Sequence, residues 1–502
     1  MPNPLNILFI LSDQMVAALT GAYGHRVVKT PNLDRLAREG VRFDAAYTPF
    51  PLCAPGRACL MTGRHASEIG AWDNGALLPA DQPTFAHYLA DAGYDTVLSG
   101  KMHFIGPDQL HGFRRRLTTD IYSSDFNWVR PEWIRIKETQ GRDCEEVMGA
   151  RPRYNALGYT AEGVQVGVWH NALSYDEETH FRALEYLRTR GRRPEEGPFL
   201  LCASYHHPHE PFWPPQEYWD LYEGAEVEIP EFPEGLDASY SMMDRNLNAY
   251  HGTRRYNLRD PDGLYRLRRA YYGLVTYTDR KVGELLDALK ANRLADRTVV
   301  VFASDHGDML CEREMVQKRC FYEWSCRVPL IVRFPDGWGA GSACSTPVSL
   351  VDLLPTFCEL AGVREMLPHD GESLLPIIEG GGGDRVVFAQ AHEAVGMPCV
   401  MARQGRYKYN YIHGYPAQLF DLEADPGEWR NLAEEAAFRG TAEALRARIL
   451  GRFDPDRMAR ENLASLYRRR MIRDTMTRQG HTWAHFPHFD ARRGASDQYL
   501  PG

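Results

Sequence analysis

The sequence predicts an α/β protein with a large, mostly parallel central sheet flanked by helices and a smaller antiparallel sheet toward its C-terminus. Short apolar runs rich in Val, Ile, Leu and Phe are typical of buried parallel strands. Stretches with helical patterns separate these runs, as in doubly wound α/β proteins. Four consecutive glycines at 380–383 form a flexible joint, beyond which shorter runs indicate antiparallel strands.

The main sheet is expected to form from runs at residues 6–11, 96–99, 199–204, 298–303 and 329–334. Polar side chains begin where four of these runs end: Asp13 after the first, Lys101 and His103 after the second, His207 after the third, and Asp305 and His306 after the fourth. An open α/β sheet binds its ligand beyond the carboxyl ends of its strands. We therefore expect these side chains to meet at one edge of the sheet.

The helices expected between these strands begin at residue 30 and cover 84–92, 265–292 and 355–361. Residues 105–195 lack clear periodicity and are interpreted as an insertion that borders the site. Beyond the glycines, residues 386–390, 400–404 and 418–421 are expected to be strands, and a helix is expected near 433–453.

This pattern predicts that the chain is divided into three parts. Residues 1–379 are expected to form the main α/β domain, and residues 384–465 a C-terminal α+β subdomain. The tail, residues 466–502, contains Trp483, Phe486, Phe489 and Tyr499 among many charges and cannot bury these rings by itself. It is expected to pack on the main body or on a neighbouring subunit, which favours a homo-oligomer, a dimer or a tetramer.

Composition excludes several classes of partner. The chain has 58 Lys and Arg against 67 Asp and Glu, a net charge of −9, which indicates neither nucleic acid nor an anionic membrane as a partner. The ten cysteines show no CxxC pair and no zinc-ribbon spacing, as expected for thiols in a reducing compartment. The first apolar run has no basic residues before it and is too short to span a membrane. We expect a cytoplasmic protein.

The segment CAPGRACLMTGR, residues 53–64, is the most informative in the chain. Pro55 is expected to initiate a helix, with Cys53 just before it. Cys53 would then lie where helix N–H groups and the positive end of the helix dipole converge, which is an oxyanion site. Arg57 and Arg64 are seven residues apart, on nearly one helical face, and would add guanidinium groups suited to sulfate or phosphate.

Asp13, Asp305 and His306 form a candidate metal site with Cys53. An all-oxygen ligand set favours Ca²⁺ or Mg²⁺, whereas a histidine shifts the preference toward Mn²⁺ or Zn²⁺. Alternatively, Asp13 or Asp305 could cap a helix that follows.

The spacing Cys-x-Pro-x-Arg…Thr-Gly-Arg resembles the signature of the type I, formylglycine-dependent sulfatases, although Gly56 replaces the common serine. The resemblance implies an alkaline-phosphatase-like fold and one divalent metal ion, Mn²⁺ or Ca²⁺ or alternatively Zn²⁺ or Mg²⁺. It also implies that a formylglycine-generating enzyme oxidises Cys53 to formylglycine. The aldehyde hydrate would attack the sulfur of a sulfate ester, expel the alcohol and then release sulfate.

The resemblance also implies roles for individual residues. Arg57 would hold the modified residue and the metal region, and Lys101 and His103 would bind sulfate and support breakdown of the hydrate. His207 would protonate the leaving group, and Lys318 and Asn74 would contact sulfate. Other readings remain open, because Asn74 could be a turn residue, Lys318 a surface charge and His207 a strand-end histidine.

Five segments are similar to bacterial choline sulfatases: residues 98–113, 116–122, 207–211, 480–483 and 495–499. This implies that Trp128, Glu393 and Asp497 bind a choline cation through an aromatic face and carboxylates. Two departures stand against it. Residues 315–320, Met-Val-Gln-Lys-Arg-Cys, differ from the Trp-Tyr-Lys-Met-Ser run expected in choline sulfatases. Gln14 replaces the second aspartate of calcium-type sulfatases, as in the phosphonate monoester hydrolases.

The predicted substrate is therefore a small sulfate ester, choline-O-sulfate or a related alkyl sulfate. An aryl sulfate or a phosphonate monoester is the alternative within the superfamily, whose phosphatases and phosphodiesterases use Ser or Thr and usually two metals. The alternative outside enzymology is an anion-binding pseudoenzyme in which Cys53 remains a thiol.

Overall fold

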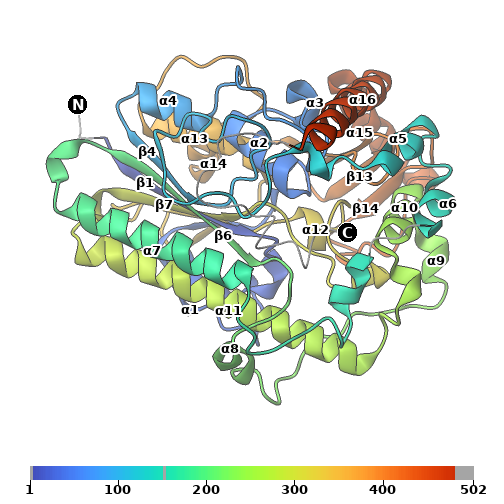
Figure 1. The fold of residues 1–502 in the computed structure, drawn as a ribbon, viewed down its shortest axis with the longest axis horizontal. Coiled ribbons are helices and arrows are strands. Elements are labelled where there is room, and N and C mark those ends of the chain that lie inside the picture. The colour runs from blue at the N-terminus through green and yellow to red at the C-terminus, as the bar shows by residue number, and fades with distance from the viewer. Residues whose placement is uncertain (1–3, 151–153, 481–502) are drawn as a thin grey trace.

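The computed structural model describes residues 4–150 and 154–480, and a large twisted sheet runs through its centre (Figure 1). The strand order is β5-β4-β6-β1-β7-β8-β2-β9. The bounds are β1 Asn6–Asp13, β2 Val41–Phe43, β4 Asp95–Gly100, β5 Arg115–Arg116, β6 Phe199–Pro208, β7 Thr298–Ser304, β8 Leu330–Arg333 and β9 Ser342–Cys344. Neighbouring strands are parallel except at β8, which is antiparallel to both β7 and β2. The mostly parallel α/β class is confirmed.

Strand β1 lies near the middle of the sheet, and its alternate side chains enter two separate cores. Ile7, Phe9 and Leu11 pack with helices α2 (Cys53–Thr62), α4 (Phe85–Asp91) and α13 (Leu353–Leu360). Leu8 and Ile10 pack on the opposite face. That face is covered by α1 (Pro31–Glu39), α7 (Asn171–Gly191) and α11 (Pro261–Ala291). Because each such buried side chain contributes ~1.5–3 kcal/mol, both faces hold the strand in register.

The two longest helices on this second face, α7 and α11, run beside each other (Figure 1). Helix α11 begins four residues before the predicted start, because Asp260 caps it and Pro261 occupies its first turn. The region expected to be an insertion contains α5 (Pro131–Glu138) and α6 (Cys144–Ala150) as well as α7. Since α7 packs against β6, the end of this region belongs to the layer that covers the sheet.

The predicted C-terminal antiparallel sheet is present as β11 (Val386–Ala391), β12 (Cys399–Gln404), β13 (Tyr407–Ile412) and β14 (Gln418–Asp421). Helix α15 (Arg439–Arg452) packs on β12 and β13. Strand β13 was not predicted, because its buried face contains Lys408 and Asn410. Lys408 is nevertheless paired there, with its Nζ 2.9 Å from Glu323 Oε1 and 2.5 Å from Glu428 Oε1.

Helix α16 (Pro455–Gln479) continues through residue 466, where the tail was expected to begin. A buried, two-pronged ion pair joins this helix to the main domain, with Arg469 Nη1 2.6 Å from Asp73 Oδ1 and Arg469 Nη2 2.8 Å from Asp73 Oδ2. Asp497, Trp483, Phe486, Phe489 and Tyr499 lie outside the described residues.

The remaining elements are β3 (Ala46–Tyr47), β10 (Val348–Ser349), α3 (Ala66–Ile69), α8 (Gln216–Asp220), α9 (Leu236–Ser239), α10 (Met242–His251), α12 (Glu323–Cys326) and α14 (Leu374–Ile378), besides short 3-10 turns. Among the described residues, no helix combines the length and the apolar character needed to span a bilayer.

Candidate active site

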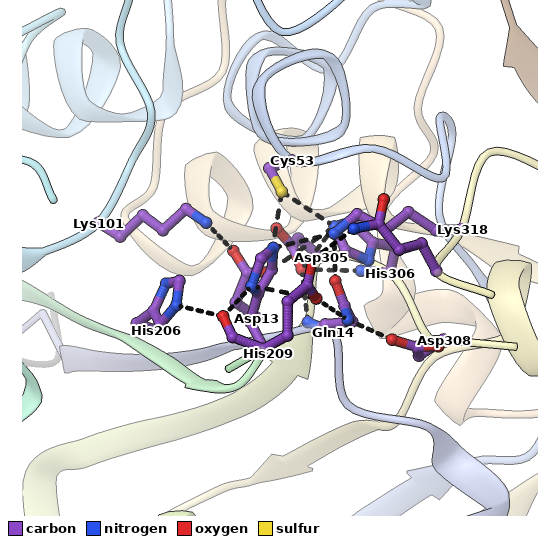
Figure 2. A network of polar contacts seen from close by, with 12 residues as sticks. Asp13, Gln14, Cys53, Lys101, His206, His209, Asp305, His306, Asp308 and Lys318 are labelled. Atoms are coloured by element: carbon purple, nitrogen blue, oxygen red, sulfur yellow. Dashed lines mark hydrogen bonds and ion pairs between the residues drawn. The ribbon is translucent and has the colours of Figure 1, made fainter. Parts of the chain in front are cut away.

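Side chains from the carboxyl ends of β1, β4, β6 and β7 meet at the first turn of α2 (Figure 2). Helix α2 begins at Cys53, two residues earlier than predicted, and all ten of its residues are buried. Asp13 ends β1, Lys101 follows β4, and Asp305 and His306 follow β7. The structure therefore brings these four side chains together at one edge of the sheet, as predicted.

Asp13, Cys53, Asp305 and His306 form a compact, buried set of possible metal ligands. Their ligand atoms all lie within 4.8 Å of one another. Cys53 Sγ is 3.2 Å from His306 Nε2 and 3.8 Å from Asp13 Oδ1. His306 Nδ1 donates to the carbonyl oxygen of Gly307 at 3.0 Å, which turns Nε2 toward the cluster as a ligand. Two carboxylates and a neutral imidazole suit a divalent cation.

Arg57 holds this cluster together through hydrogen bonds to both aspartates. Its Nε donates to Asp305 Oδ2 at 2.8 Å, and its Nη2 donates to Asp13 Oδ2 at 2.9 Å. Its Nη1 donates to the Lys101 carbonyl at 2.6 Å and to Ser204 Oγ at 2.8 Å. Every nitrogen of the guanidinium is thus occupied by the protein, so Arg57 positions the two carboxylates.

Arg64, by contrast, does not join Arg57. Helix α2 ends at Thr62, and Gly63 adopts a left-handed conformation with φ +63°, which turns the chain out of the helix. Arg64 Nη1 donates to Gln82 Oε1 at 3.3 Å, on the partly exposed side. The expectation that both arginines share one helical face is wrong for this reason.

The pKa values of the two aspartates are shifted in opposite directions. Although burial opposes it, the charges of Lys101, His209 and Arg57 hold the pKa of Asp13 well below its usual value. Lys101 Nζ lies 2.5 Å from Asp13 Oδ2. Burial raises the pKa of Asp305 to about 6, against the charge of Arg57. Neither Asp13 nor Asp305 caps a described helix.

Cys53 is a poor nucleophile as a thiol in this environment. Burial and the charge of Asp13 raise the pKa of its thiol to about 11. The thiol is therefore protonated near neutral pH, and only the thiolate attacks efficiently. Direct attack by Cys53 sulfur is disfavoured, whereas an oxygen group at the same place would lie beside Asp13 and His306.

Lys318 lies across the cluster from Lys101, and His209 lies between them, beside Asp13 (Figure 2). Lys318 Nζ lies 2.9 Å from His209 Nε2 and also contacts Gln14 Oε1. The amide nitrogen of Gln14 donates to Glu210 Oε2 at 2.6 Å and contacts Asp308 Oδ2. Gln14 thus connects two buried carboxylates to the Lys318 ammonium. The sequence places Gln14 next to Asp13, but nothing in the sequence indicates this role.

His207, the predicted proton donor, faces away from these residues. Its Nδ1 lies 2.7 Å from Asp176 Oδ2, and its ring packs against His170 and Tyr277. His209 takes the position expected for His207, since its Nε2 is 3.9 Å from Asp13 Oδ1. In the parts of the chain that the structure describes, no contact joins His207 to Asp13, Cys53 or Lys318. The strand continues through Pro208, which carries His209 to the site.

His103 and Trp128 lie on the Lys101 side of the site. The His103 ring is 4.9 Å from the ring of Tyr122 and 5.3 Å from that of Trp128, between centroids. Burial and the charge of Lys101 lower the pKa of His103 to about 3, so its imidazole is neutral. Neither of its ring nitrogens has a hydrogen-bond partner among the described residues, which leaves both available to a ligand.

Asn74 and Glu393 adjoin the start of α2. Asn74 Oδ1 accepts a hydrogen bond from the backbone N–H of Ala54 at 3.1 Å, so Asn74 is next to residue 53. The backbone N–H of Asn74 donates to Glu393 Oε2 at 2.9 Å. Glu393 is not a free carboxylate, because Arg319 Nη2 lies 2.9 Å from its Oε1.

Comparison with known proteins gives consistent likenesses. A family model described as "Sulfatase" matches residues 5–363, and a second, described as "N-sulphoglucosamine sulphohydrolase, C-terminal", matches residues 311–453. The "Choline-sulfatase" of Rhizobium meliloti is 40% identical over 436 residues, which cover 86% of this chain and 82% of that protein. The "Arylsulfatase" of Clostridium perfringens is 27% identical over 470 residues, which cover 88% of this chain and 92% of that protein.

Among solved structures, the phosphonate monoester hydrolase of Agrobacterium radiobacter is similar with a TM-score of 0.70 and 25% identity, covering 89% of this chain and 95% of that one. The fold that the sequence resemblance implied is thereby confirmed.

Proposed function

The chain belongs to the sulfatase family, and on this premise we propose that it hydrolyses a sulfate monoester to an alcohol and inorganic sulfate. The observation that carries the proposal is the buried cluster of Asp13, Cys53, Asp305 and His306, surrounded by the cations of Lys101 and Lys318. A sulfate ester is an anion, and such a cluster provides both a reactive residue and the positive charge to hold it.

Two groups complete this site. Residue 53, once oxidised to formylglycine, supplies an oxygen nucleophile, and a divalent metal ion supplies positive charge beside it. Asp13, Asp305 and His306 would hold the metal together with the oxygens of residue 53, for which the Cys53 sulfur stands in here. Their donor set fits a divalent cation such as Mn²⁺ or Ca²⁺, with Zn²⁺ or Mg²⁺ as alternatives.

The other residues bind and orient the ester. The ammonium groups of Lys101 and Lys318 lie on opposite sides of residue 53 and would bind the non-bridging oxygens of the sulfate. The unpaired ring nitrogens of His103 and the amide of Asn74 would supply further hydrogen bonds. Arg57 keeps the two carboxylates fixed, and the burial of these groups excludes water, which strengthens each interaction.

We assign protonation of the leaving oxygen to His209 in place of His207. The assignment is supported by the 2.9 Å distance from His209 Nε2 to Lys318 Nζ and by the bond from its Nδ1 to the Glu210 carbonyl at 2.8 Å. The second contact fixes the ring with Nε2 facing Lys318. Burial and the charge of Lys318 lower the pKa of His209 well below its usual value, so the resting imidazole is neutral and Nε2 accepts from the Lys318 ammonium. Lys318 therefore supplies the proton that Nε2 passes to the leaving oxygen.

Replacing His209 by Gln is expected to lower kcat for alkyl sulfates by ~10²–10⁴, the usual contribution of a general acid. The loss should shrink for aryl sulfates such as 4-nitrophenyl sulfate, whose leaving groups need little protonation. His207→Gln is the matched control and should give a smaller loss with no dependence on the leaving group. Steady-state kinetics over esters of different alcohol pKa test this. A leaving-group dependence found in H207Q and absent from H209Q would return the role to His207.

The proposed substrate is a small alkyl sulfate. The 40% identical relative is named a choline-sulfatase, which makes choline-O-sulfate the first ester to test. Aryl sulfates come next, since one relative is named an arylsulfatase. Phosphonate monoesters follow, since Gln14 and the likeness to a phosphonate monoester hydrolase favour them. A pseudoenzyme is disfavoured because Asp13, Arg57, Lys101, Asp305, His306 and Lys318 are all retained around residue 53.

Sulfate release tests the proposal directly. The protein, coexpressed with a formylglycine-generating enzyme, is incubated with choline-O-sulfate, 4-nitrophenyl sulfate and a phenyl phosphonate monoester, and the products are measured by ion chromatography. We expect sulfate release from at least one sulfate ester to exceed phosphonate cleavage. Faster phosphonate cleavage would favour the alternative enzyme, and no cleavage of any ester by converted, metal-loaded protein would contradict the proposal.

Three further proposals concern the protein outside its site. We propose that it depends on a formylglycine-generating enzyme for maturation, that it resides in the cytoplasm, and that it forms a homo-oligomer through residues 466–502. Asp497 would then contribute to the site of a neighbouring subunit. Size-exclusion chromatography with light scattering, on the full chain and on a chain ending at Met471, separates an oligomer from a monomer.

A further inference from the structure

The loop at Asn74 and Gly75 joins the two groups that a cationic alcohol would need. Gly75 lies against Trp128, because a Cβ at Gly75 would be 3.1 Å from Trp128 Cβ. On the other side, the Asn74 N–H donates to Glu393 Oε2. The loop therefore joins Trp128, whose ring centroid is 5.3 Å from that of His103, to the buried carboxylate of Glu393 beside residue 53. An aromatic ring and a carboxylate are the groups that attract a quaternary ammonium ion.

The carboxylate of Glu393 is already neutralised by Arg319. Arg319 Nε and Nη2 donate to Glu393 Oε1 at 3.0 and 2.9 Å, while Oε2 is occupied by Asn74. Both side chains are buried, with 5% and 1% of the Arg319 and Glu393 side chains exposed. Water therefore screens this ion pair little, and a second cation could reach Glu393 only by displacing the guanidinium.

The guanidinium is also held from its other side. Arg319 Nη1 donates to Gln317 Oε1 at 2.7 Å, and the Arg319 backbone N–H donates to the Pro51 carbonyl at 3.0 Å. The guanidinium also lies over the ring of Tyr250, with 5.5 Å between the guanidinium carbon and the ring centroid. Arg319 directly follows Lys318, at the place where the run expected in choline sulfatases has methionine. The arginine is thus fixed in place beside the site.

We propose that Arg319 is a specificity-determining residue: by neutralising Glu393 it makes the site prefer sulfate esters of uncharged alcohols over esters of a quaternary ammonium alcohol. This inference rests on the proposed sulfatase function and defines its substrate class. The guanidinium repels a cation directly and removes the negative charge that would attract one.

Two isosteric esters measure this preference. Choline-O-sulfate and 3,3-dimethylbutyl sulfate have the same shape and differ by the positive charge, so the ratio of their kcat/KM values reports the electrostatics of the alcohol pocket. The wild type is expected to favour the neutral ester. Arg319→Met leaves Glu393 unpaired and should shift the ratio toward choline-O-sulfate by about tenfold, close to the weakest couplings measured for close charge pairs.

Matched variants separate the effect of the removed charge from the effect of a less stable fold. Glu393→Gln leaves Arg319 unpaired and should shift the ratio further against choline-O-sulfate, whereas the double variant R319M/E393Q should return it close to the wild-type value. Arg385→Met removes a different buried arginine, paired with Asp352 at 2.5 Å, and should lower stability without changing the ratio. A wild type that prefers choline-O-sulfate, and loses that preference in E393Q, would overturn the inference.

Binding of free choline gives a readout that is independent of turnover. Titration calorimetry should show weak or no binding to the wild type and measurable binding to R319M. Tight binding by the wild type that E393Q abolishes would contradict the role of Arg319, whatever the catalytic result. Failure of the sulfatase proposal has a different signature, since then converted protein cleaves neither sulfate ester, although the choline titrations still give their answer.

Discussion

Replacing Cys53 by Ala is expected to abolish sulfate release, with kcat falling by at least ~10⁴-fold, the scale seen when a covalent nucleophile is removed. The alanine side chain can neither be oxidised to formylglycine nor supply an oxygen to the site. Lys101, Lys318 and the metal ligands would still bind the ester, so KM should change much less than kcat. Sulfate release by ion chromatography, with the unmutated protein alongside, measures the loss.

The fold should survive this change. Cys53 is the first residue of α2, and alanine has a higher helix propensity than cysteine. Cys59→Ala is the matched control, because Cys59 is also buried in α2 but lies outside the metal cluster. It should cost some stability through the cavity it leaves, yet retain activity. Sulfate release that persists in C53A would remove residue 53 from the mechanism.

Replacing Asp13 by Asn should remove the metal ion and lower kcat by at least ~10³-fold, since a bound cation contributes several kcal/mol to charge stabilisation. Asp13 contacts Arg57, Lys101 and Cys53, so its loss also leaves two buried cations without one of their carboxylates. Breaking such a buried pair typically costs ~3–5 kcal/mol of folding stability. Metal content by mass spectrometry and a urea unfolding curve give the two effects separately.

Asp308→Asn is the control for this experiment. Asp308 is buried near the site and contacts Gln14, and burial together with the charge of Glu210 raises its pKa to about 7. It is not a member of the ligand cluster, so the variant should keep one divalent ion for each chain. A D13N protein with a full complement of metal and wild-type kcat would contradict the assignment of Asp13 as a ligand.

The sequence was sufficient to predict the central strands, and the structure explains why. Strands β1, β6 and β7 are buried on both faces, so each contains a run of five consecutive apolar residues that is easily recognised in the sequence. Strand β13 shows the opposite case. Its buried face contains Lys408, whose charge is compatible with burial only because Glu323 and Glu428 pair with it. Both glutamates are close to Lys408 in space but lie outside the strand, so the local sequence of β13 does not reveal the pairing.

The possible metal ligands were also predictable, because each lies at the end of a strand or at the start of a helix. Which of two nearby histidines enters the site was not. His207 and His209 are separated by one proline, and the choice between them depends on how far β6 continues before the chain turns. The pairing of Arg319 with Glu393 likewise joins residues from distant segments, so no local pattern indicated it.

The measurement that tests the central claim most directly is the mass of the tryptic peptide that contains residue 53. The protein is taken from its native host or from cells that contain a formylglycine-generating enzyme. We expect the peptide to carry an aldehyde or its hydrate in place of the Cys53 thiol. An unmodified thiol in every molecule would contradict the formylglycine mechanism and favour a binding protein or a different hydrolytic chemistry.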